Sequence, residues 1–174
     1  YGSEEDVLKR LIDCCDLVEG TDIFRLTSES PFTLFEFIES GWNQHLKNNN
    51  DLTAIDNLPD GSGYEIIKKE AYDSSWINGS ERHRSELCSL YIRENKSKFK
   101  FELVDIPFEL KRTDIRLTVD YPEDLILCRE IYNKFKYLAP RIPLLEIIKF
   151  LDSRPDLKKI VDPLIDEGLK TMYI

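Results

Sequence analysis

The sequence lacks any apolar run that approaches the length of a membrane span, and its first residues have neither the basic nor the apolar segment of a signal peptide. Basic residues are also scarce, since 24 lysines and arginines stand against 33 acids and give a formal net charge of -9. A general binder of nucleic acids or anionic membranes needs a basic face. We therefore expect a cytoplasmic protein whose partners include neither a nucleic acid polymer nor a membrane.

The four cysteines lack the Cys-x-x-Cys spacing that zinc sites and redox sites use. Three of them lie on the apolar faces of predicted helices, as small hydrophobic residues do in a core. The spacing therefore predicts that Cys14, Cys15, Cys88 and Cys128 are reduced core residues, with no metal-binding or redox role.

The amino-acid composition is typical of a single folded domain. Apolar residues make up 41% of the 174 residues, which is enough for one buried core. No internal repeat, low-complexity linker or shift in composition marks a boundary, so we expect residues 1–174 to form a single α/β domain.

Hydrophobic periodicity predicts alternating helices and strands along the chain. This alternation favours a layered α/β sheet, although the order begins with a helix rather than a strand. The predicted helices are 3–20, a helix opening at Thr33, 69–77, 81–94, 122–136, a helix from Pro143 to Leu151, and a last segment from Leu157. The predicted strands are 22–26, 52–55, 64–67, 99–104 and 115–119.

Apolar residues in the stretch from Arg116 to Tyr132 recur at every second position in its first part and at helical spacing in its second part. Residues 115–119 alternate as a strand does, and they are predicted to pair antiparallel with the strand at 99–104. A helix follows, so Asp120 falls at the carboxyl end of a strand, where ligands bind in open α/β sheets. Asp120 and Glu123 also have the spacing of a capping box, and the alternative that Asp120 is only a helix cap stays open.

Five motifs occur in the order found in the cytidylyltransferase family, which includes the spore-coat polysaccharide biosynthesis protein F group and is similar to the CMP-sialate and CMP-KDO synthetases. The similarity runs from Gly2 to about Asn133. The motifs are Gly2-Ser-Glu-Glu-Asp-Val-Leu-Lys-Arg10, Arg25-Leu-Thr-Ser-Glu-Ser-Pro31, Pro59-Asp-Gly-Ser-Gly-Tyr-Glu65, Arg84-Ser-Glu-Leu-Cys-Ser-Leu-Tyr-Ile92 and Arg116-Leu-Thr-Val-Asp-Tyr-Pro-Glu-Asp-Leu125.

This resemblance implies a three-layer, Rossmann-like (GT-A-like) nucleotidyltransferase fold, with a sheet flanked by helices. It implies CTP as donor, Mg²⁺ as cofactor, a sugar acid or related sugar as acceptor, and a homodimer. The product would be a CMP-sugar for surface polysaccharide or glycan biosynthesis. Carried over by motif, the catalytic, metal-binding carboxylates are Glu29 and Asp120.

Further positions follow from the same motifs. Glu65 and Glu86 match family acids and are expected to bind substrate, as are Ser28 in the Glu29 loop and Arg84, whose guanidinium suits an acceptor carboxylate. Two positions depart from the family pattern. Glu29 stands where an aspartate is usual, and Leu87 stands where the family has a histidine.

The family's glycine-rich loop, whose arginine and lysine cradle the triphosphate, would precede Tyr1. The chain is therefore expected to be the C-terminal two thirds of a nucleotidyltransferase domain, lacking the N-terminal strand and loop. The alternative is a non-catalytic dimerisation or interaction module that retains the scaffold, with residues 64–114 as its partner surface. A sugar-nucleotide-dependent glycosyltransferase is a weaker option, because no Asp-x-Asp triplet occurs.

Overall fold

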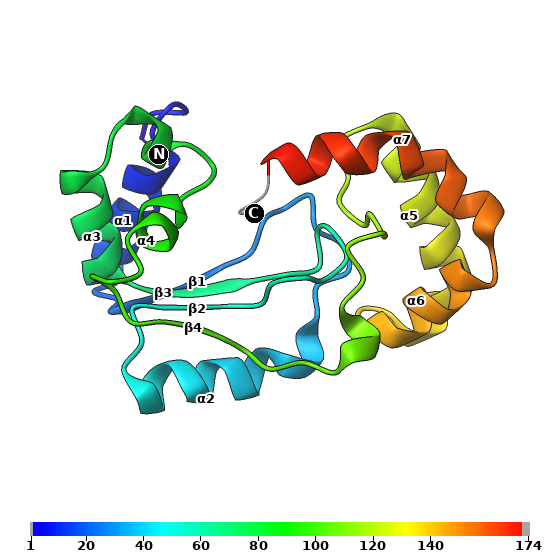
Figure 1. Cartoon of the computed structure of the whole chain (residues 1–174), viewed down its shortest axis with the longest axis horizontal. Coiled ribbons are helices and arrows are strands. Elements are labelled where there is room, and N and C mark those ends of the chain that lie inside the picture. Colours follow the sequence, from blue (N-terminus) through cyan, green and yellow to red (C-terminus); the bar gives the residue numbers. More distant parts are fainter. Residues whose placement is uncertain (1, 172–174) are drawn as a thin grey trace.

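A mixed sheet of four strands runs through the computed structural model, which describes residues 2–171 (Figure 1). The strands are β1 (Asp22–Arg25), β2 (Leu52–Ala54), β3 (Glu65–Lys68) and β4 (Phe101–Leu103), in the spatial order β1-β3-β2-β4. β3 runs antiparallel to both β1 and β2, and β4 runs parallel to β2. The carboxyl ends of β1, β2 and β4 therefore meet at one edge of the sheet.

Seven α-helices surround this sheet in the described part of the chain. Figure 1 shows α1 (Val7–Leu17), α3 (Lys69–Asn78) and α4 (Leu90–Glu94) on one side of the sheet and α2 (Ile38–Asn48) on the other. The helices α5 (Pro122–Phe135), α6 (Leu144–Asp152) and α7 (Pro155–Thr171) form a group beyond the strand ends. None of the described helices is long and apolar enough to cross a membrane. The α/β sheet flanked by helices is confirmed.

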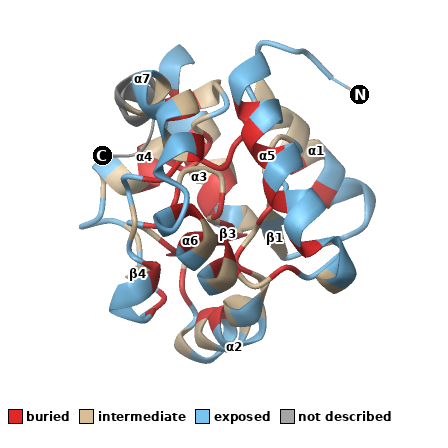
Figure 2. Cartoon of the chain, turned by 90° about the vertical axis from the view of Figure 1, so that its right-hand side faces the viewer, coloured by how far each residue is buried: buried red, intermediate tan, exposed pale blue. Residues whose placement is uncertain are grey.

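The buried apolar side chains form two clusters, and Figure 2 shows the buried residues between the helices and the sheet. The first cluster lies between α5, α6 and the loops beyond the strands, and Leu117, Leu127 and Ile131 are at most 1% exposed there. The second packs α1 and α3 against the sheet through Leu8 and Tyr72, both 0% exposed.

The predicted strand at 115–119 is wrong. This segment is extended but forms only an isolated parallel bridge between Asp60 and Arg116. The Asp60 N–H donates to Ile115 O (2.9 Å), and the Asp60 carbonyl accepts from Leu117 N (2.8 Å). The pairing does not extend beyond this one bridge. The predicted antiparallel partner, β4, instead pairs in parallel with β2.

The predicted helix over 81–94 is also wrong, because the chain breaks in its middle. A 3₁₀ turn covers Glu81–Arg84, and α4 starts only at Leu90. The Ser85 hydroxyl donates to Arg82 O (2.9 Å) and accepts from Leu87 N (3.3 Å). A serine that bonds its neighbouring backbone in this way competes with helical hydrogen bonds.

Other boundaries shift by a few residues. The first helix covers Val7–Leu17 rather than 3–20, and the helix predicted to open at Thr33 begins at Ile38, after a 3₁₀ turn. All four cysteines are free, and Cys15, Cys88 and Cys128 are buried as expected. Cys14 is exposed, so its assignment to the core is wrong. Burial raises the pKa of the Cys88 thiol to about 11 and that of Cys128 to about 12.

Glu102 links β4 to the region around α2, and this link predicts how stability depends on pH. Its Oε2 accepts from the amides of Asn50 (3.0 Å), Asn48 (2.7 Å) and Gln44 (3.0 Å), which lower its pKa to about 2. An unfolded glutamate titrates near about 4.3, so this stabilisation is present above that pH and is lost as the pH falls toward 2. We expect Glu102→Gln to be less stable than the wild type at pH 7, with the difference shrinking below about pH 4. Urea unfolding across this range measures it, and a constant difference would contradict it.

Candidate active site

A cleft of about 750 Å³ lies at the carboxyl ends of the parallel strands. Five parts of the chain line it: the end of β1 with the following loop, the loop from β2 to β3, the turn before α4, α4 itself, and the extended segment before α5. Open α/β sheets bind ligands at this edge, since side chains from several strand ends converge there. The cleft is therefore the candidate active site.

The two predicted metal carboxylates lie in this cleft. Glu29 and Asp120 both line it, and the backbone N–H of Val119 donates to Glu29 O at 3.0 Å. This hydrogen bond places the Glu29 loop directly beside the segment that carries Asp120. Two acids that are far apart in the sequence therefore line the same cleft.

The other predicted site residues divide into two groups. Glu65 and Glu86 line the cleft, whereas Ser28 and Arg84 are not among its lining residues. The Arg84 guanidinium lies over the Trp76 ring, 5.2 Å from its centroid, and donates to Trp76 O at 3.4 Å. Arg84 is thus packed against α3.

Asp120 does not cap α5. The capping acid is Asp124, whose Oδ2 accepts from the backbone N–H groups of Asp120 and Tyr121, both at 3.0 Å. The capping box assigned to Asp120 and Glu123 is therefore wrong, because it was placed one residue too early. The Asp120 side chain is 46% exposed and lines the cleft.

Arg116 is a cleft residue that the sequence reasoning missed. Its side chain is 3% exposed and pairs with Asp124 (2.8 Å), Asp60 (2.8 Å) and Asp120 (2.7 Å). We call these four residues the Arg116 cluster. Arg116 lies in the segment whose alternation predicts a strand, and no periodic signal distinguishes a buried, paired arginine from an exposed one.

The ionisation of the Arg116 cluster follows from burial and pairing. Burial alone would lower the pKa of Arg116, but its aspartate partners raise it above the ordinary value. Burial would raise the pKa of Asp124, but the Arg116 guanidinium and two backbone N–H groups hold it below the usual range. Burial raises the pKa of Asp60 despite its Arg116 partner. The charged form is thus disfavoured at Asp60 and favoured at Asp124.

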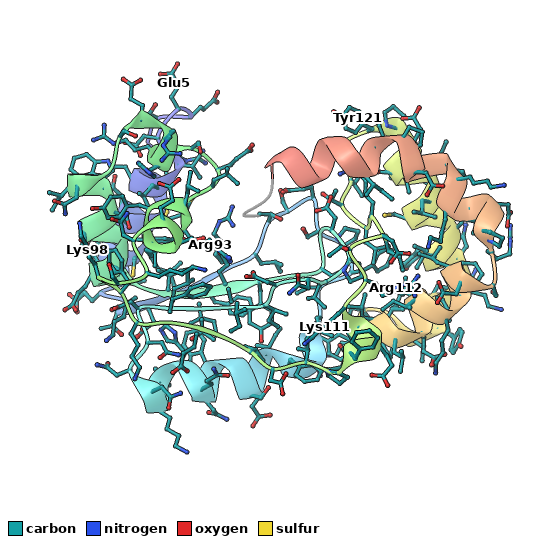
Figure 3. The ribbon with its side chains drawn as sticks, viewed as in Figure 1. Glu5, Arg93, Lys98, Lys111, Arg112 and Tyr121 are labelled. Carbon is teal, nitrogen blue, oxygen red and sulfur yellow. The ribbon has the colours of Figure 1, made fainter. Side chains whose placement is uncertain are left out.

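A second charged network lies on the other side of the cleft. Glu65 is buried, and its carboxylate pairs with Arg93 (3.0 Å) and Arg25 (3.3 Å), while Arg93 also pairs with Asp56 (3.1 Å). Figure 3 shows Arg93 pointing from α4 into the space that separates it from Tyr121, and both residues line the cleft. Arg25 also donates to the backbone O of Glu86 at 2.6 Å. Sequence reasoning missed Arg25, Arg93 and Asp56, because their partners lie far away along the chain.

Neither of the two histidines, His45 and His83, is among the described residues that line the cleft. Leu87, at the position where the family has a histidine, does line it. The nearby His83 is buried, and its ring nitrogens contact Ser80 N (2.8 Å) and Glu94 Oε2 (2.9 Å). His83 therefore joins the 3₁₀ turn to α4 rather than facing a substrate.

Among the described residues, six carboxylates and three guanidinium groups line the cleft, so these residues give it an excess of negative charge. Within the described chain, no group of three or more His, Cys, Asp or Glu side chains is arranged to hold a metal ion. Mg²⁺, however, is commonly held by one or two carboxylates together with substrate phosphates and waters. Glu29 and Asp120 fit that donor set.

Gly61 allows the loop of Asp60 to approach the segment of Arg116. Its φ is +81°, and a Cβ there would lie 2.6 Å from Thr118 N and 2.8 Å from Thr118 Cα. We expect Gly61→Ala to cost about 1–3 kcal/mol in the free energy of unfolding. Gly63→Ala is the control, because its Cβ would meet only Ile55 O, at 3.3 Å. Urea unfolding measures both, and an unchanged Gly61→Ala variant would contradict the expectation.

Comparison with known proteins supports the family that the motifs indicated. No family model matches the sequence. The chain is 35% identical over 159 residues to an uncharacterized protein of Methanocaldococcus jannaschii, and 30% identical over 156 residues to the spore coat polysaccharide biosynthesis protein SpsF of Bacillus subtilis. These matches cover 91% and 89% of this chain, which spans 65% of the length of each relative.

A solved structure shares the fold. The chain is similar to a cytidylyltransferase from Leptospira borgpetersenii serovar Hardjo-bovis, with a TM-score of 0.79 and 22% sequence identity. The match covers 90% of this chain and 66% of that one. The expected Rossmann-like α/β fold is therefore confirmed.

Proposed function

We propose, from this relationship to SpsF and to the cytidylyltransferase fold, that the chain carries the metal-binding and acceptor side of a Mg²⁺-dependent cytidylyltransferase. Its substrates would be CTP and a sugar acid or related sugar, and its product would be a CMP-sugar for surface polysaccharide or glycan biosynthesis. The observation that carries the proposal is that Glu29 and Asp120 both line the cleft at the strand ends, on segments joined by the hydrogen bond from Val119 N to Glu29 O.

The proposed reaction is a displacement at phosphorus. A hydroxyl oxygen of the sugar bonds to the α-phosphorus of CTP, the bond from that phosphorus to the bridging oxygen breaks, pyrophosphate leaves, and the hydroxyl proton is released. Alignment and neutralisation of phosphate charge make up most of the catalysis of such a step. The protein's task is therefore to hold the two substrates in line.

Glu29 and Asp120 would hold Mg²⁺ in this cleft. The bound ion would supply positive charge to the phosphate oxygens. The three lining arginines are each paired with a carboxylate, so the described cleft has no surplus of positive charge to offer a triphosphate. This charge balance supports the need for a divalent cation.

Pyrophosphate release from CTP tests the proposed function. The whole natural protein would be assayed with CTP, Mg²⁺ and a panel of sugars with and without a carboxylate. We expect release that depends on a sugar and stops with EDTA. Sugar-independent release would point to simple hydrolysis. If calorimetry detected no binding of CTP and Mg²⁺, the alternative of a non-catalytic interaction module would be favoured.

A homodimer stays a prediction, and the segment from residue 64 to 114 remains the proposed partner surface. Phe108 in this segment is 83% exposed, which is unusual for a large apolar side chain. Sedimentation equilibrium of the wild type and of Phe108→Ser would show whether the chain pairs through this surface. A wild-type monomer at all concentrations would contradict the prediction.

A further inference from the structure

We propose that Arg116 is a positioning residue for Asp120, whose carboxylate it holds ready for a divalent cation. The inference rests on the proposed function, because that function gives Asp120 its metal. Arg116 is 3% exposed and belongs to the extended segment before α5. Its guanidinium sits at the meeting point of three acids from three parts of the chain.

The donors of Arg116 are divided among these acids in a fixed way. Nε and Nη2 bind the two oxygens of Asp124 at 2.8 and 2.9 Å. Nη2 also reaches Asp120 Oδ2 at 2.7 Å, and Nη1 reaches Asp60 Oδ2 at 2.8 Å. A guanidinium is a rigid planar fork, so one group sets the orientation of all three carboxylates. A lysine, which is a single point charge, cannot do the same.

The backbone of Asp120 is held by the same pair. Asp124 Oδ2 accepts from the N–H groups of Asp120 and Tyr121, and both oxygens of Asp124 are also bonded to Arg116. Arg116 therefore acts on the Asp120 carboxylate directly and on its peptide through Asp124. Because both the carboxylate and the backbone of Asp120 are held, Asp120 samples fewer conformations before a metal ion binds.

The arrangement leaves one carboxylate oxygen of Asp120 for a ligand. Oδ2 is bonded to Arg116, whereas Oδ1 has no hydrogen-bond partner within the described chain. One positive charge on Arg116 faces three negative charges on its aspartates, which leaves two negative charges in excess when all three are ionised. A divalent cation would balance that excess.

A purely structural role for Arg116 would be to join the Asp60 loop to α5. Arg112 is the comparison outside the cleft, because it also pairs with two aspartates, Asp114 (2.7 Å) and Asp152 (2.7 Å), but is more exposed and does not line the cleft. Figure 3 shows Arg112 well away from Tyr121, which follows Asp120. An arginine-to-lysine change at each position distinguishes the two roles. Only the change at Arg116 should affect metal binding if Arg116 positions Asp120, because Arg112 bridges aspartates outside the cleft.

The test measures Mn²⁺ binding by electron paramagnetic resonance in the whole natural protein, with and without CTP. For Arg116→Lys we expect Mn²⁺ to bind at least tenfold more weakly than to the wild type. The metal concentration that gives half-maximal pyrophosphate release should rise in parallel, so that excess metal restores part of the rate. Arg112→Lys should stay within twofold of the wild type in both measurements. Thermal unfolding would show whether the variants are folded.

The outcomes separate this inference from the proposed function. If Arg116→Lys binds Mn²⁺ as the wild type does while Asp120→Asn binds it weakly, the positioning role is overturned and the metal role of Asp120 stands. If Asp120→Asn itself binds Mn²⁺ normally, the metal role in the proposed function fails. Should Arg116→Lys not fold, Asp124→Asn replaces it, with the same tenfold loss expected and with wild-type affinity overturning the inference.

Discussion

Asp120→Asn is expected to lower the maximal rate of pyrophosphate release by about 100-fold or more. The change removes the negative charge of one of the two proposed metal carboxylates and weakens the hydrogen bond that Arg116 Nη2 makes with it at 2.7 Å. Because Asp120 is 46% exposed and Asp124 provides the cap, the fold should not depend on this charge. Steady-state assays with saturating CTP measure the effect.

The control for Asp120→Asn is Asp152→Asn. Asp152 also pairs with an arginine, Arg112, but it does not line the cleft. The control should keep its rate within about twofold of the wild type, since a partly exposed ion pair contributes little. Full turnover in Asp120→Asn would remove the main site assignment, whereas an equal loss in both variants would point to a general loss of activity.

Arg116→Met is expected to lower the free energy of unfolding by about 3–5 kcal/mol, because it leaves buried carboxylates without their cation. Asp124, with a side chain that is 0% exposed, would be the most affected. In the wild type the lowered pKa of Asp124 adds stability above its unfolded value, and that stability is lost as the pH falls. In the variant, burial without a cation raises the pKa of Asp124. Lowering the pH should therefore reduce the difference in unfolding free energy between the variant and the wild type. Urea unfolding at pH 7 and near pH 4 measures both effects.

The control for this stability prediction is Arg112→Met. The Arg112 side chain is 24% exposed and its partners Asp114 and Asp152 are about half exposed. Water screens such a network, so its loss should cost about 1 kcal/mol or less. If the two variants were equally stable, or if acid increased the deficit of Arg116→Met, the account of the Arg116 cluster would be wrong.

Local pattern predicted much of the order of helices and strands but not their pairing. The alternation over residues 115–119 identified an extended segment, yet Arg116 and Thr118 are buried, as are the apolar residues Ile115 and Leu117 beside them. Their burial depends on acids and loops from elsewhere in the chain. The helix predicted over 81–94 is wrong for a related reason, since the Ser85 hydroxyl bonds the backbone of Arg82 and Leu87, and a helix-like composition does not reveal this.

The candidate site was predictable where a topological rule applied. A carboxylate at the end of a strand-like segment is expected at the ligand-binding edge of an α/β sheet, which predicts the position of Asp120, whereas the match to the family motif predicts that of Glu29. Both residues line the cleft. Arg25, Arg93 and Arg116 were missed, because a buried arginine is defined by acids that only the tertiary structure brings to it. Ser28 and Arg84 were matched by motif alone, and neither lines the cleft.

The central claim is that Glu29 and Asp120 share one divalent cation, and a double-mutant cycle on Mn²⁺ affinity tests it most directly. Glu29→Gln and Asp120→Asn would be measured singly and together in the whole natural protein. The account predicts that each single change weakens Mn²⁺ binding at least tenfold, and that the double variant binds little more weakly than either single one. Two fully additive losses, or no loss from either change, would contradict a shared ion.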